Sequence, residues 1–184
     1  MKTTSEAAFE TAIESVLLGA GYNRLDGKGF DRERAIFPDE ALAFIQTTQS
    51  KVWGKLEALQ GAETGNRVLE ALCKWLDAHG TLDTLRHGFK CFGKTLRIAF
   101  FRPAHGLNPE LEARYQANRL GLTRQLHFSP RSEQSLDVAL SGNGIPVLSL
   151  ELKNPLSGQT VAEAIHQYRH DRDPREPIFT FAKR

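Results

Sequence analysis

The chain has 184 residues, of which 40% are hydrophobic and 25% charged, a composition that excludes a disordered or collagen-like protein and predicts one soluble domain. Its two cysteines exclude a disulfide framework, and no apolar run reaches the roughly 18 residues of a membrane helix, so we expect a cytoplasmic protein without membrane contact. The net charge of +2 argues against a strongly basic domain, but it sums an acidic segment 1–50, with five Lys/Arg and eight Asp/Glu, and a segment 86–131 of net charge +7.

The first predicted element is an amphipathic helix over residues 5–18. Its apolar residues recur at three- and four-residue spacing, which is typical of a helix with one buried face. They are Phe9, Ile13, Val16 and Leu17. Glutamate recurs every four residues on the opposite stripe, at Glu6, Glu10 and Glu14, and such a row ordinarily faces solvent.

Helices are predicted next over residues 39–60 and 66–79, and together they define a helical block at about 38–85. From residue 86 the pattern changes to short apolar runs bounded by Gly, Pro, Asn and Ser, which predicts strands. The predicted strands cover residues 89–92, 95–101, 122–128, 136–140, 145–152 and 178–181. Two further helices are expected at 108–119 and at about 159–172.

The Asn143-Gly144 pair predicts a tight hairpin turn between the strands 136–140 and 145–152, because such turns need residues that accept a positive φ. Asp137 interrupts the first of these apolar strands, and Glu151 and Lys153 end the second. If the turn lies at Asn143-Gly144, the two strands run side by side and bring Asp137 close to Glu151.

Two carboxylates and one ammonium group at this position suit a hard divalent cation such as Mg²⁺ and the hydrolysis of phosphodiesters. Charged residues at a strand end also commonly face solvent, and a Glu-x-Lys pair alone has little specificity. The apolar runs that precede Asp137 and Glu151 favour the functional interpretation, because unpaired charge is costly next to buried surface.

Asp137 followed by Glu151-Leu152-Lys153 resembles the metal-binding and catalytic signature of the PD-(D/E)XK nucleases. The wider stretch 118–153, with Arg124-Gln125 and the Asn-Gly-Ile-Pro turn, resembles the N-terminal nuclease domain of type I restriction enzyme R subunits. The opening Glu6-Ala7-Ala8-Phe9-Glu10 is similar to that domain's first helix. The resemblance implies an α/β fold with a restriction-endonuclease-like core, a mixed sheet flanked by helices, in which 38–85 is a helical insertion.

The resemblance also implies the roles of individual residues. Asp137 and Glu151 would bind Mg²⁺, with the Leu152 carbonyl as a third ligand, and Lys153 would act at the attacking water. Glu10 is a further candidate ligand, although a solvated position explains it equally well.

In this family a Gln-x-x-x-Tyr motif on the helix after the hairpin supports the site and the contact with DNA. Gln167 matches its first position, but the position four later is Asp171, and Tyr168 directly follows the glutamine. Gln167 is therefore a candidate catalytic residue and Tyr168 a candidate for DNA binding. The basic segment adds Arg124 and Arg131 as candidates for contact with the phosphate backbone.

As a whole, the resemblance implies a type I site-specific deoxyribonuclease from a bacterium or archaeon. It would cleave double-stranded DNA together with methyltransferase and specificity subunits. The chain contains no Gly-x-x-x-x-Gly-Lys-Ser/Thr motif, so the ATP-dependent translocase of such R subunits would lie elsewhere, and we interpret residues 1–184 as a single nuclease domain from a longer protein. Two alternatives are a non-catalytic module that grips DNA or docks a subunit, and a stand-alone repair nuclease of the same superfamily.

Overall fold

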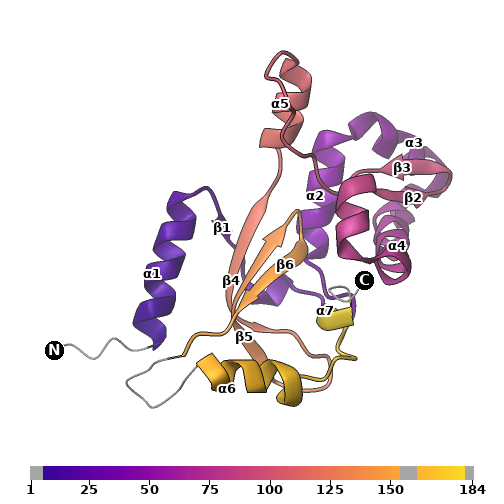
Figure 1. The fold of residues 1–184 in the computed structure, drawn as a ribbon. Helices are drawn as coiled ribbons and strands as arrows, with labels where there is room; N and C mark the ends of the chain where they lie inside the picture. The colour runs from indigo at the N-terminus through magenta and orange to yellow at the C-terminus, as the bar shows by residue number, and fades with distance from the viewer. Residues whose placement is uncertain (1–5, 154–160, 181–184) are drawn as a thin grey trace.

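The computed structural model of the chain describes residues 6–153 and 161–180, and at its centre lies a four-stranded mixed sheet (Figure 1). The strand order is β1 (Asn23–Arg24), β4 (Leu120–His127), β5 (Ser135–Gly142) and β6 (Ile145–Leu150). β4, β5 and β6 are antiparallel neighbours, whereas β1 is parallel to β4. The sequence predicts β4, β5 and β6 but not β1, because two residues are too few to show the alternation of a strand.

Helix α1 (Glu6–Gly19) covers one side of the sheet (Figure 1). Ile13 and Leu17 pack there against a small core that includes Leu122 and Val138. The predicted apolar stripe is wrong at its other two positions, because Phe9 and Val16 are exposed.

The helical block and a main core lie on the other side of the sheet (Figure 1). The block consists of α2 (Pro38–Thr48), α3 (Ser50–Gln60) and α4 (Thr64–His87). The sequence predicts an end at residue 79, but the helical pattern resumes after Gly80, whose positive φ of 80° kinks α4 without ending it. One continuous cluster joins residues of the block, such as Phe44 and Leu72, to sheet residues such as Leu126 and Leu136.

Three predicted strands need correction. The runs 89–92 and 95–101 form only β2 (Phe89–Cys91) and β3 (Lys94–Leu96), which pair with each other outside the main sheet. The run 178–181 is helical where it is described, as α7 (Pro177–Thr180), because Pro177 favours the first turn of a helix and the Glu176 carbonyl accepts from two following N–H groups. Residue 181 lies outside the described residues.

The remaining helices agree with the sequence in position. α5 (Pro109–Gln116) projects from the fold and begins at Asn108, whose side chain accepts from the backbone N–H groups of Glu110 and Leu111 (Figure 1). α6 (Val161–His166) continues into a π-helical turn, Gln167–Asp171. No helix within residues 6–153 and 161–180 is long and apolar enough to cross a membrane.

The Asn143-Gly144 turn adopts the conformation that the sequence predicts. Both residues have positive φ, 51° and 82°, and Gly142 pairs with Ile145 on either side of them. This is the pattern of a two-residue type I′ turn. The turn docks on the segment before α2, where the Gly144 carbonyl accepts from the backbone N–H of Phe37 at 2.8 Å.

We predict that Gly144→Ala destabilises the protein by more than about 1 kcal/mol, since the residue combines a positive φ with a tight site. A Cβ atom at this position would lie 2.5 Å from the Phe37 carbonyl oxygen and 2.8 Å from the Ala41 nitrogen. The midpoint of urea unfolding measures the effect.

Gly142→Ala, in the same hairpin, is the matched control, because a Cβ atom there would meet nothing within 4 Å. We expect its unfolding midpoint to stay near that of the wild type. Equal midpoints for the two variants would contradict the assigned turn geometry.

Candidate active site

A β-bulge in β6 sets which residues face each other at the end of the hairpin. Ser141 pairs with Pro146 but Leu140 pairs with Leu148, so Val147 has no partner on β5. The shifted register continues to Val138 and Leu150, where β6 ends. Asp137 precedes Val138 on β5 and Glu151 directly follows β6, so the two carboxylates lie next to each other. Without the extra residue Asp137 would lie opposite Leu150. The bulge therefore brings together the two carboxylates that the sequence singles out.

Both carboxylate oxygens of Asp137 accept hydrogen bonds from neutral groups. Its Oδ2 atom accepts from the backbone N–H of Leu152 at 2.7 Å, and its Oδ1 atom lies 3.3 Å from the Gln125 Nε2 atom. The Asp137 carboxylate is thus oriented from two sides by β4 and by the residues that follow β6.

Glu151 is almost completely buried and forms an ion pair with Arg172. Burial is the main reason why the pKa of Glu151 is raised, the charge of Arg172 lowers it, and the charge of Asp137 raises it again. The pKa of Glu151 also responds to a hydrogen-bonding contact with Asp137, so the two carboxyl groups are direct neighbours. The sum of these effects favours the protonated form of Glu151 more than in a solvated glutamate.

Arg172 is a residue of this site that sequence reasoning missed. Its guanidinium is buried, donates to the Ser135 carbonyl at 2.9 Å as well as to Glu151, and lies 5.2 Å from the centre of the Phe128 ring. A buried glutamate requires a cation nearby, but the spacing of 21 residues carries no signal that would identify which arginine supplies it.

The other predicted residues near the hairpin are only partly described. Leu152 contributes its N–H to Asp137, Lys153 follows it and is half-buried, and no described contact involves the Lys153 ammonium group. The side chains of Gln167 and Tyr168 lie outside what the structure describes.

The sequence predicts that the row of glutamates containing Glu10 and Glu14 faces solvent. In the structure these two residues lie on the buried face of α1. Arg124 reaches both: its Nη2 atom lies 2.7 Å from Glu10 Oε2 and its Nη1 atom 3.1 Å from Glu14 Oε2. Arg24 adds a second ion pair to Glu14, with Nε 2.6 Å from Oε1. β1 and β4 provide the arginines that pair with the buried Glu10 and Glu14, and the hydrogen bond to Glu10 is the main reason why the pKa of Arg124 is raised.

Three other arginines of the basic segment also form ion pairs. Arg114 pairs with Glu110, Arg119 with Glu40, and Arg131 with Glu176. Arg131 is more than half exposed, whereas Arg124 is occupied by two buried carboxylates. Contact with DNA stays a prediction for Arg131 and Arg124, and the structure gives Arg124 a role in docking α1.

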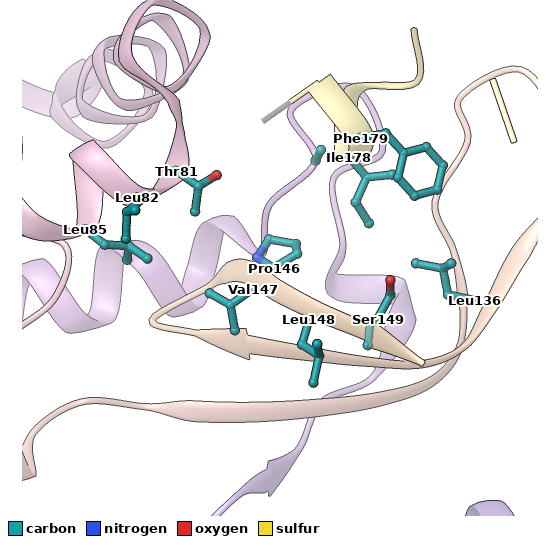
Figure 2. Close-up of a pocket in the computed structure, with 12 residues that line it drawn as sticks. Thr81, Leu82, Leu85, Leu136, Pro146, Val147, Leu148, Ser149, Ile178 and Phe179 are labelled. Atoms are coloured by element: carbon teal, nitrogen blue, oxygen red, sulfur yellow. The ribbon is translucent and has the colours of Figure 1, made fainter. Parts of the chain in front are cut away.

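A hollow in the described surface lies apart from these carboxylates. It is an apolar groove of about 490 Å³ between α4, β6 and α7, and no titratable side chain lines it (Figure 2). Leu82 and Leu85 come from α4, Val147 and Leu148 from β6, and Ile178 from α7. The groove offers the hydroxyls of Thr81 and Ser149 but no titratable group that could act as a general acid or base.

The chain was compared with known protein families. The family described as "Type I restriction enzyme R protein N terminus" matches residues 3–183, which is nearly the whole chain. The chain is a member of this family.

Membership of the type I restriction enzyme R protein N-terminus family confirms the resemblance that the hairpin residues indicate. The predicted fold class is confirmed as well: a mixed α/β fold in which helices flank a four-stranded sheet, with a restriction-endonuclease-like core. Comparisons with curated proteins and with solved structures give no significant match.

We predict that Arg172→Met destabilises the protein by about 3 kcal/mol at pH 8, because it leaves the Glu151 carboxylate buried without its cation. Loss of Arg172 removes the main influence that lowers the pKa of Glu151, so the pKa in the folded state rises further above its unfolded value. Stability from a raised pKa is present below the unfolded pKa and is lost as the pH rises through the folded pKa. The loss should therefore be smaller at pH 5 than at pH 8, as measured by urea unfolding.

Arg175→Met is the control, since Arg175 pairs with Asp173 in an exposed position. We expect little change in the unfolding midpoint at either pH. A loss in Arg172→Met that is the same at pH 5 and pH 8 would contradict the role of Arg172 as the counter-ion of Glu151.

Proposed function

We propose that this chain is the nuclease domain of a type I restriction enzyme R protein and hydrolyses phosphodiester bonds of double-stranded DNA with Mg²⁺. The observation that carries the proposal is that the Asp137 and Glu151 carboxyl groups are neighbours at the end of the bulged hairpin, in a chain whose family is that of these R proteins. Neighbouring carboxylates repel each other, and a divalent cation between them offsets that repulsion.

The donor set fits Mg²⁺ better than it fits a transition metal. Asp137 and Glu151 offer carboxylate oxygens, and the Leu152 carbonyl is a further oxygen next to them in the chain. The part of the chain that is described holds no group of three or more His, Cys, Asp or Glu side chains arranged to hold a metal. Mg²⁺ tolerates such a small protein contribution, because it commonly keeps several waters and shares its shell with phosphate.

Among the residues that the structure describes, Gln125 connects Glu10 to this site. The Gln125 Nε2 atom donates to Glu10 Oε1 at 2.8 Å and also contacts Asp137, while Arg124 holds the other oxygen of Glu10. We therefore propose Asp137 and Glu151 as the principal ligands and Glu10 as a carboxylate of the surrounding shell.

The chemistry divides between the metal and the chain. When bound, Mg²⁺ polarises the phosphate and lowers the pKa of a coordinated water. Lys153 orients the attacking water and stabilises the negative charge that develops on the phosphate. Its place two residues after Glu151 and its half-buried position support this role. Gln167 would support the site, and Tyr168 would contact DNA.

The remaining parts of the function lie with partners. In the whole enzyme an ATP-dependent translocase would deliver DNA to this domain, and methyltransferase and specificity subunits would recognise the sequence. Arg131 would contact phosphate, since its side chain is more than half exposed even though it pairs with the buried Glu176.

We predict that the protein binds Mg²⁺ and that Asp137→Asn and Glu151→Gln each weaken the affinity at least tenfold, because each removes a negatively charged ligand. Isothermal titration calorimetry with MgCl₂ measures the dissociation constant. Glu57→Gln is the control, because Glu57 is an exposed residue of α3 away from the hairpin. Unchanged affinity in both site variants would contradict the proposed ligands, and a wild-type protein that binds no Mg²⁺ would favour the non-catalytic docking module.

We predict a different result for Lys153→Met. Its Mg²⁺ affinity should stay within a few-fold of the wild type, since an ammonium group is no metal ligand, while DNA cleavage by the complete restriction enzyme should fall at least about 100-fold. Supercoiled plasmid cleavage measures the loss. Lys94→Met, on β3, serves as the control for removing a lysine. Retained cleavage in Lys153→Met would exclude the role at the attacking water.

A further inference from the structure

Gln125 holds an unusual backbone conformation in the middle of β4. Its φ is +48°, although strand residues are extended and residues other than glycine seldom adopt positive φ. The alternation of the strand breaks at this point: Leu122 belongs to the small core under α1, whereas Leu126, four residues later, belongs to the main core. On β5 the same change separates Val138 from Leu136. Backbone strain of this kind persists only where the surroundings enforce it.

The side chain of Gln125 joins three elements at the strained position. Its Nε2 atom donates to Glu10 Oε1 of α1 at 2.8 Å and lies 3.3 Å from Asp137 Oδ1 of β5. Its Oε1 atom accepts from the Ser135 hydroxyl at 3.2 Å. A primary amide has two N–H donors, so one Gln125 side chain can serve both carboxylates at once.

Asp137 differs from the other carboxylates nearby in the charge of the groups that donate hydrogen bonds to it. Glu10 and Glu151 each have an arginine partner, Arg124 and Arg172. The Gln125 amide and the Leu152 N–H both donate to Asp137, and both are neutral. A neutral donor fixes the direction of a carboxylate without cancelling its charge, so it leaves the full negative charge for a cation.

We propose that Gln125 is a positioning residue of the active site, which orients the Asp137 carboxylate for the divalent cation and couples it to Glu10 on α1. The inference rests on the proposed function, because it assigns Asp137 to a metal. The strained φ of Gln125 brings the amide to this position, and the strain is retained because a regular strand would not place the same side chain between α1 and β5.

Two substitutions separate the amide from the backbone. Gln125→Ala and Gln125→Gly both remove the amide, but only glycine adopts the positive φ without strain. We expect both variants to bind Mg²⁺ about tenfold more weakly than the wild type by calorimetry, as is typical for loss of a group that orients a metal ligand. We also expect Gln125→Gly to unfold at a higher temperature than Gln125→Ala, because it relieves the strain that alanine keeps.

Three outcomes would overturn the proposal. If both variants bind Mg²⁺ as the wild type does, Gln125 positions nothing. If Gln125→Ala binds weakly but Gln125→Gly binds normally, the affinity follows the backbone strain and not the amide. If the wild-type protein binds no Mg²⁺, the proposed function and this inference both fail. The first outcome, combined with weaker binding in the Asp137 variant, would refute this inference and leave the proposed function standing. Because glycine suits this φ, the Gln125→Gly variant remains informative even if Gln125→Ala does not fold.

Discussion

The contact of Arg124 with Glu10 and Glu14 is the interaction on which the arrangement around the site depends. Both carboxylates are buried between α1 and the sheet, where an unpaired charge costs several kcal/mol. α1 therefore lies where Arg124 reaches both of them at once. This position leaves the second oxygen of Glu10 directed at Gln125, and through Gln125 it connects α1 with Asp137.

Ion pairs of this kind also join the acidic and the basic segments of the sequence. The N-terminal segment is acidic and the segment 86–131 is basic, and the fold brings them together through Glu10, Glu14 and Glu40. Four arginines of the basic stretch, Arg114, Arg119, Arg124 and Arg131, are thus paired with carboxylates within the molecule. In the sequence, Arg119 and Arg124 belong to a basic segment that suggests contact with DNA. In the fold, each forms an ion pair with a glutamate of a helix, Arg119 with Glu40 of α2 and Arg124 with Glu10 of α1.

Two irregularities in otherwise regular strands form the carboxylate site. The bulge at Val147 shifts the pairing of β6 by one residue, and Glu151, directly after this strand, lies next to Asp137. The positive φ of Gln125 turns a polar side chain of β4 toward the same aspartate. Each departs from ideal strand geometry at a cost, and such departures commonly occur next to active sites.

The sequence by itself determined the hairpin and its Asn143-Gly144 turn, because turn chemistry and strand periodicity are local properties. The sequence also led us to expect Asp137 near Glu151, but the register that brings them together depends on the bulge at Val147, which the sequence did not predict. It also determined the family, through residues near that hairpin. The tertiary structure alone decided that Glu10 is buried and that Arg172 pairs with Glu151, since these contacts join residues more than 20 positions apart. A carboxylate on a helix is solvated or buried according to whether another element brings a cation to it, and local sequence carries no record of that partner.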